Sequence, residues 1–384
     1  MMEFTSLLQL MIDRSATDMH LAAGLPPVLR VDGALLPAEE AASPLPDPET
    51  SPLAAVLFPR GSDTAYPRVR AHSTRLPNFD QGQIQALLEP LLSSQQQKSI
   101  AANYAARILV EHDKSFFLVT VFGGSRQWTA AVRRLISKAP TLTDLQFPAT
   151  TSWMVQKPQG LMLVTGSQAR DTKTTAAALL NGINMSRTLR ALTIESDPGY
   201  LQTSKMSMVT QMFVGLDIAS AADGLRLARD CDMELVYIDD LADGDTLRCA
   251  LDLMNAGCAV IAAGPAKDTS TAINRLIDRS ADAAASVRSC LSEHLCAAIA
   301  QHRIPNTKGG GSHIAYEILL GTPSVKKLIA AGERDFRPAM RAGQDAHMIT
   351  MADAVRQYYE RGFITKETMM ECIAEFQADV ADDC

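Results

Sequence analysis

Residues 163–175 read LVTGSQARDTKTT and contain most parts of a phosphate-binding loop. Such a loop reads GxxxxGK(S/T), follows a buried strand and opens a helix. Its backbone N–H groups turn toward phosphate oxygens, its Lys neutralises charge and its hydroxyl holds magnesium. Gly166 supplies the first Gly, but Asp171 stands at the second and Thr172 at the Lys. The candidate nucleotide-binding residues are Gly166, Ser167, Gln168, Ala169, Arg170, Asp171, Thr172, Lys173 and Thr174.

Two alignments of this loop stay open. Without a gap, Lys173 falls on the position of the magnesium-binding hydroxyl. With a slip of one residue, Lys173 and Thr174 form the Lys–hydroxyl pair, but the loop is then too long and lacks its second Gly. In both alignments Asp171 aims a carboxylate at phosphate, which is repulsive at close range. ATP and Mg²⁺ are the cofactors that this segment suggests, and a loop that only caps a helix is the alternative.

A second candidate for chemistry is an apolar strand that ends in acid, residues 235–240, which read LVYIDD. This is the Walker B pattern, whose carboxylate polarises water or holds magnesium, and it makes Asp240 a candidate catalytic residue. Acids at the end of a buried strand near a helix N-terminus would look the same. His294 and His302 lie eight residues apart, which predicts one helix face, but a metal site needs a third ligand and we identify none.

The elements that must position these residues differ between the two halves of the chain. The first half predicts an α+β domain, with a Pro-, Ala-, Ser- and Asp-rich loop or insertion over about 37–77. Its expected helices cover 3–13 and 80–103, and its expected strands cover 18–21, 28–31, 116–122 and 128–135, the last two as a hairpin.

From residue 160, short apolar strands alternate with helical stretches, which predicts a parallel sheet covered on both faces. The expected strands are 161–164, 190–194, 233–238 and 259–263, and the expected helices are 174–184, 219–229 and 245–255. From residue 286 onward the sequence predicts a run of helices.

Composition narrows the function classes. A chain of 384 residues predicts two domains, and 47% apolar and 21% charged residues are globular values. A net charge of −7 argues against a nucleic-acid partner. The apolar runs are short of a membrane span, no signal peptide is expected, and seven scattered Cys predict free thiols in a reducing cytoplasm.

Several ordered strings resemble one family. Residues 16–27, ATDMHLAAGLPP, with RVDG at 30–33, closely resemble the ASDLHLSAGLPP…RVDG of the type IV pilus retraction ATPases, the PilT and PilU proteins of the type II/IV secretion ATPases. Residues 317–323, EILLGTP, resemble a late segment associated with retraction, and residues 2–11 are similar to PilU. The resemblance implies an α/β fold, with a PAS-like domain over 1–140 that carries a Pro-rich insertion near 37–75. It also implies a RecA-like P-loop NTPase domain with a C-terminal helical bundle over 141–384.

The same resemblance implies roles for single residues. Residues 192–195 resemble the start of the family's Asp box, which makes Glu195 a candidate catalytic residue, but the box's catalytic Glu falls on Gly199. The His of the His box falls on Pro265, and neither Gly nor Pro can move a proton. The Gly-Glu that ends the family's Walker B strand becomes Asp239 and Asp240.

Family arginines on the first domain reach the phosphates of a neighbouring subunit. Arg126 and Arg133 occupy two of these positions, whereas Phe116 and Leu118 replace an earlier pair.

We therefore expect a degenerate retraction-motor subunit, accessory or regulatory, with weak or absent ATP hydrolysis. An active ATPase with a rearranged pocket, using Lys173, Thr174, Glu195 and Asp240, and a non-motor interaction platform are the alternatives. The expected partners are copies of itself in a hexamer or an intact retraction ATPase paralogue, and the pilus inner-membrane platform protein. The expected location is cytoplasmic and peripheral at the inner membrane.

Overall fold

The computed structural model describes residues 3–31, 34–38, 76–103, 105–123, 127–148, 152–241, 243–280, 283–306, 312–343 and 347–377. The chain divides into two compact units, residues 1–137 and 138–384, which are described separately. The expected insertion near 37–75 lies almost entirely outside the described residues.

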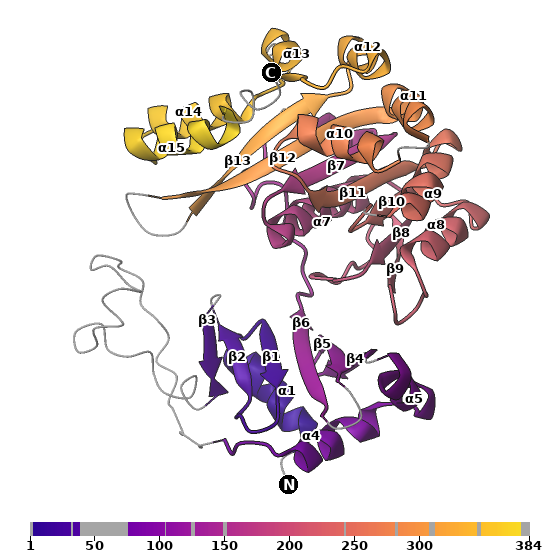
Figure 1. Cartoon of the computed structure of the whole chain (residues 1–384), viewed down its shortest axis with the longest axis vertical. Helices are drawn as coiled ribbons and strands as arrows, with labels where there is room; N and C mark the ends of the chain where they lie inside the picture. The colour runs from indigo at the N-terminus through magenta and orange to yellow at the C-terminus, as the bar shows by residue number, and fades with distance from the viewer. Residues whose placement is uncertain are drawn as a thin grey trace. The chain divides into compact units, whose positions relative to one another are not determined.

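The first unit is a six-stranded antiparallel sheet with three α-helices packed on it (Figure 1). The strand order is β3-β2-β1-β6-β5-β4. The strands are β1 (Asp18–Leu21), β2 (Val28–Val31), β3 (Ala34–Pro37), β4 (Ala105–His112), β5 (Ser115–Phe122) and β6 (Thr129–Leu135). The helices are α1 (Phe4–Asp13), α4 (Gln81–Leu88) and α5 (Ser94–Asn103), with a short 3-10 turn, η1 (Glu89–Leu91).

Most of this unit follows the sequence pattern. The predicted hairpin is confirmed, since Phe122 pairs with Thr129 in the antiparallel β5–β6 ladder, and the helix over 3–13 is α1. Sequence reasoning missed the edge strands β3 and β4. β3 has only four residues, and in β4 the exposed positions include Ala105 and Leu109, so its sequence does not alternate between apolar and polar residues although its burial does.

The second unit is a seven-stranded sheet in the order β13-β12-β7-β11-β10-β8-β9, parallel except for β13. Its strands are β7 (Leu161–Gly166), β8 (Arg190–Glu195), β9 (Met208–Phe213), β10 (Leu235–Ile238), β11 (Ala259–Pro265), β12 (Leu295–Pro305) and β13 (Ser312–Leu320). Its helices are α6 (Ser152–Gln156), α7 (Ala169–Ser186), α8 (Ala221–Asp230), α9 (Gly244–Asn255), α10 (Thr269–Asp278), α11 (Ala284–His294), α12 (Pro323–Ala331), α13 (Arg337–Ala342), α14 (Met351–Glu360) and α15 (Lys366–Gln377).

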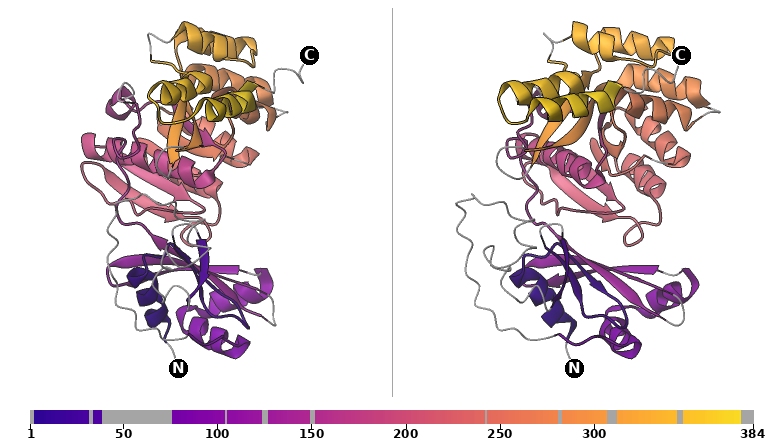
Figure 2. Two further views of the ribbon diagram at one scale, coloured as in Figure 1. Left: turned by 90° about the vertical axis from the view of Figure 1, so that its left-hand side faces the viewer. Right: turned by 60° about the vertical axis from the view of Figure 1, so that its left-hand side comes forward.

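Helices cover both faces of this sheet, as the alternation of strands and helices predicts. Helix α7 lies on one face, and α8 to α11 lie on the other (Figures 1 and 2). Because β7, β8, β10 and β11 are parallel, their carboxyl ends meet at one edge of the sheet. This is the edge at which α/β proteins commonly bind ligands.

The expectation of helices alone after residue 286 is wrong, because β12 and β13 interrupt them. β12 is an interior strand between β13 and β7, its first seven residues are buried, and the first six of them, residues 295–300, form a continuous apolar run. Periodicity alone cannot distinguish such a strand from a buried helix. His294 ends α11 and His302 lies on β12, so the two do not share a helix face.

Candidate functional site

The segment expected to wrap phosphate is largely helical. β7 ends at Gly166, Gln168 is the N-cap of α7, and α7 begins at Ala169. The prediction of a helix that starts at Thr174 is therefore wrong. Only Ser167 and Gln168 separate strand from helix, whereas the motif needs an extended loop at this point.

Residues 171 and 172 in the first turn of α7 form helical hydrogen bonds. The N–H groups of Asp171 and Thr172 donate to the Gln168 carbonyl at 3.1 and 3.2 Å. The buried Thr172 hydroxyl donates to the Ala169 carbonyl at 2.8 Å. Without a second Gly, this segment loses the residue that favours leaving the helix, and Asp171 is a favourable residue for a helical first turn.

The Gly that matches the motif is required by packing. A Cβ at Gly166 would lie 2.8 Å from the Gln301 carbonyl oxygen and 3.2 Å from Thr172 Cγ2. β7 therefore passes too close to β12 and α7 for any side chain at this position. The presence of Gly166 is explained without a phosphate ligand.

Asp171 forms a two-point ion pair with Arg303 of β12. Arg303 Nε donates to Asp171 Oδ2 at 2.9 Å, and its Nη2 donates to Oδ1 at 2.5 Å. The hydrogen bonds that Arg303 donates to Asp171 raise the pKa of Arg303, and the Asp171 side chain is only 14% exposed. Sequence reasoning missed Arg303, because β12 was expected to be helical.

Lys173 is bound by carboxylates at the carboxyl edge of the sheet. Its Nζ donates to Asp239 Oδ2 at 3.0 Å and to the Asp197 carbonyl at 3.1 Å, with Asp197 Oδ2 at 3.4 Å. Asp239 directly follows β10, and its side chain is 3% exposed. Its Oδ2 also accepts from the N–H groups of Ser196 and Asp197 at 2.9 and 3.0 Å. Among the residues after β10, Asp239 rather than Asp240 contacts Lys173.

Glu195 is the last residue of β8 and is buried beside this cluster. Its Oε1 accepts from Thr193 Oγ1 at 2.8 Å and from Gln211 Nε2 at 2.7 Å. Burial, with a smaller contribution from the negative charge of Asp239, raises the pKa of Glu195 to about 7 against the opposing effect of the two hydrogen bonds and Lys173. Glu195 therefore combines a near-neutral pKa with an oxygen already used by two donors.

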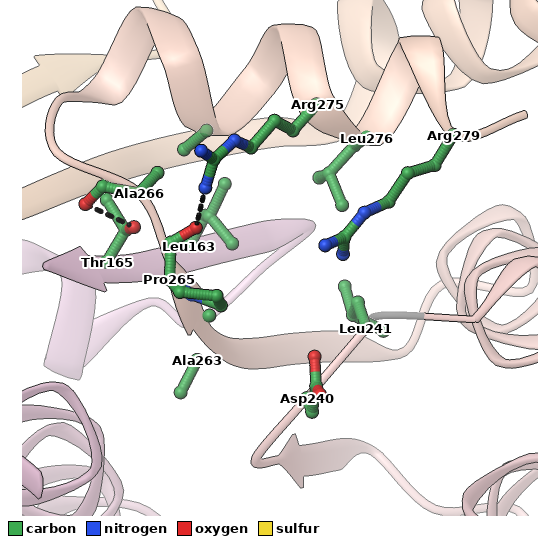
Figure 3. A pocket seen from close by; sticks show the side chains of 12 residues that line it. Leu163, Thr165, Asp240, Leu241, Ala263, Pro265, Ala266, Arg275, Leu276 and Arg279 are labelled. Carbon is green, nitrogen blue, oxygen red and sulfur yellow. Dashed lines mark hydrogen bonds between the residues drawn. The ribbon is translucent and has the colours of Figure 1, made fainter. Parts of the chain in front are cut away.

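Asp240 lines a small pocket that faces α10 (Figure 3). Arg275 and Arg279 reach into this pocket from α10 and its C-terminal end, and Arg275 Nη1 donates to the Pro265 carbonyl at 2.6 Å. Lys173 does not line it. The two carboxylates proposed for catalysis, Glu195 and Asp240, thus lie in different surroundings.

The arginines of the first unit are only partly described. Arg133 Nε donates to Asp18 Oδ1 at 2.9 Å, and Arg30 Nε lies 3.6 Å from Asp18 Oδ2. The Asp18 side chain is 10% exposed and therefore holds Arg133 within its own unit. Arg126 lies outside the described residues.

A triphosphate does not fit this arrangement. The loop is too short, Asp171 presents a carboxylate at the helix N-terminus, and the Lys173 ammonium is bound by Asp197 and Asp239. Within the described part of the chain, no group of three or more His, Cys, Asp and Glu side chains could hold a metal ion.

Across the ranges that the structure describes, we find no helix with the length and apolar character needed to cross a membrane.

Comparison with known proteins gives relatives along nearly the whole chain. It is 28% identical to the type IV pilus retraction ATPase PilT of Pseudomonas aeruginosa, with 96% of this chain and 98% of that protein covered. It is 26% identical to the type IV pilus ATPase PilU of the same organism, with 100% and 90% covered. A twitching motility protein of Neisseria gonorrhoeae is 27% identical, with 78% and 82% covered.

A solved structure shares the fold. The crystal structure of the pilus retraction motor PilT with bound ADP superposes with a TM-score of 0.77 at 24% identity, covering 97% of each chain. No protein-family model matches the chain.

Proposed function

We infer that this chain, which belongs to the PilT and PilU family of type IV pilus retraction ATPases, acts in twitching motility as an accessory or regulatory motor subunit with weak or absent ATP hydrolysis. The relatives named for retraction and twitching support the motility role. The observation that carries the accessory role is the binding of Lys173 by the chain's own Asp239 and Asp197. A phosphate would have to displace these oxygens before Lys173 could neutralise it.

The residues at the positions expected to act as general base or acid are also unsuited to ATP hydrolysis. Glu195 is buried, and its Oε1 already accepts two hydrogen bonds. Asp240 lines the pocket beneath α10, and Gly199 and Pro265 have no titratable side chain. A general base must reach the attacking water, directly or through one other water. The placement of these four residues supports the proposal that ATP hydrolysis is weak or absent.

The rest of the proposal concerns assembly. The first unit serves as the PAS-like domain and the second as the RecA-like domain of a ring, formed with copies of this chain or with an intact paralogue. In such a ring an intact neighbour that binds ATP would drive rigid-body movement, and this subunit would transmit it. The ring would work at the cytoplasmic side of the inner membrane, through the pilus platform protein.

Steady-state phosphate release tests this proposal. The purified full-length chain is measured alone and mixed with an intact retraction ATPase, with Lys173→Ala as the matched variant. We expect background turnover alone, no effect of Lys173→Ala, and altered turnover or motility only in the mixture. Turnover near that of an active motor, abolished by Lys173→Ala, would refute the accessory role.

One observation favours a second candidate, an active ATPase with a rearranged pocket. Lys173, Glu195 and Asp239 lie together at the carboxyl edge of a parallel sheet, where ligands commonly bind. Micromolar, magnesium-dependent ATP binding by the unaltered protein would favour this candidate. If the chain is strictly monomeric at micromolar concentration and joins no paralogue, the non-motor interaction platform is favoured instead.

A further inference from the structure

We propose that Asp171 and Asp239 are internal substitutes for nucleotide phosphates, and that their ion pairs with Arg303 and Lys173 autoinhibit nucleotide binding. The inference rests on the proposed function and adds a cause for it. Position 171 is Gly in the pattern GxxxxGK(S/T), and position 239 directly follows the buried strand β10. This chain has a carboxylate at both positions, and each carboxylate binds a cation, Asp171 binding Arg303 and Asp239 binding Lys173.

The first pair involves the lysine itself. Asp239 Oδ2 accepts from Lys173 Nζ at 3.0 Å and from the N–H groups of Ser196 and Asp197 at 2.9 and 3.0 Å. One buried oxygen thus collects an ammonium and two backbone donors, the kind of group set that otherwise binds a phosphate oxygen. Because Asp239 is 3% exposed, water competes little for these bonds.

The second pair occupies the helix N-terminus. Asp171 lies in the first turn of α7, where partial positive charge attracts an anion, and Arg303 binds both of its carboxylate oxygens. The carboxylate therefore takes the electrostatic role that a phosphate has at a nucleotide-binding helix. Asp171 also stabilises residues 169–171 as the first turn of α7, whereas a phosphate-binding loop would need these residues outside the helix.

The two pairs act together on any incoming anion. A phosphate would have to displace Asp239 from Lys173 and overcome the charge of Asp171 at the same time. Both carboxylates belong to the same chain as the cations, so they compete at a high effective concentration. A nucleotide in solution is disfavoured even though the fold around the site is intact.

Replacing both carboxylates by Gly should reverse this. Asp171→Gly/Asp239→Gly removes one carboxylate from Arg303 and one from Lys173, which keep Ser312 and Asp197 as partners, and it lets residues 169–171 leave the helix, since Gly weakens a helix. A second variant, Asp171→Asn/Asp239→Asn, removes both charges while keeping the side-chain shape. Asp278→Asn is the matched control, because it removes an exposed aspartate that pairs with Arg334 elsewhere in the same unit.

The test is a titration of the full-length variants with a fluorescent ATP analogue, with and without Mg²⁺, after circular dichroism has shown that each is folded. We expect the glycine pair to bind at least about tenfold more tightly than the unaltered chain, the asparagine pair to gain affinity to a smaller extent, and Asp278→Asn to gain none. If neither folded pair gains affinity, the inference is wrong. If the glycine pair is unfolded, the asparagine pair decides alone.

This outcome is separable from the test of the proposed function. Suppose that the variants gain no affinity for the ATP analogue and that the unaltered chain neither binds nor hydrolyses ATP. The accessory role then stands, but the ion pairs of Asp171 and Asp239 are not its cause. If the unaltered chain binds as tightly as the variants, the pairs are not inhibitory, whatever its turnover.

Discussion

Lys173 should stabilise the folded chain even when no nucleotide is present. Its side chain is 19% exposed, and its Nζ lies 3.0 Å from Asp239 Oδ2, whose own side chain is 3% exposed. Lys173→Met keeps the aliphatic part and removes the charge, leaving Asp239 buried with an unpaired carboxylate. Removing one partner of a buried pair costs about 3–5 kcal/mol, and the two backbone donors to Asp239 reduce this toward about 2–3 kcal/mol.

The assay is thermal unfolding followed by circular dichroism, without ATP. A loss of about 2–3 kcal/mol lowers the Tm of a unit of this size by roughly 4–12 °C. Lys327→Met is the matched control, since Lys327 is an exposed lysine on α12 of the same unit. A surface change of this kind costs about 0.5 kcal/mol or less. If Lys173→Met costs no more than Lys327→Met, the ion pair is not formed as described.

Three further predictions concern neighbouring groups. Glu195 has a pKa of about 7 in the folded chain against 4.5 ordinarily, so its contribution to stability is fully present below pH 4.5 and is lost as pH rises through 7. Glu195→Gln should therefore flatten the pH dependence and stabilise the protein by up to about 3 kcal/mol at pH 8, measured by urea unfolding at pH 5 and 8. Gly166→Ala should cost about 1–3 kcal/mol with or without nucleotide, because its Cβ would meet the Gln301 carbonyl at 2.8 Å, and equal Tm values for variant and parent would contradict the packing argument. Arg303→Ala should cost about 1–2 kcal/mol in chemical unfolding by leaving Asp171 unpaired, and the loss should disappear in an Asp171→Asn background if the pair is its cause.

The parallel sheet could be predicted from the sequence, because β7, β8, β10 and β11 are short apolar runs separated by helical stretches. β12 could not, since a strand buried on both faces has no alternation to distinguish it from a helix. That single error hid Arg303, which is placed beside α7 only when residue 303 belongs to a strand adjacent to β7.

The candidate site could be located from the sequence but not resolved. The positions of Asp171 and Lys173 identified an altered loop, yet the start of α7 depends on hydrogen bonds that sequence patterns do not report. Sequence reasoning chose Asp240 as the acid of the site, whereas its neighbour Asp239 contacts Lys173. Which of them faces α7 depends on the direction of alternate side chains at the end of β10, and this direction places Asp239 beside Lys173. Whether either residue takes part in catalysis stays a prediction.

Calorimetric titration of the unaltered full-length chain with ATP and Mg²⁺ tests the central claim most directly. We predict no saturable heat at micromolar nucleotide, because the chain's own carboxylates bind the cations that phosphates would need. A saturable, magnesium-dependent signal with a micromolar Kd that Lys173→Ala removes would contradict this account.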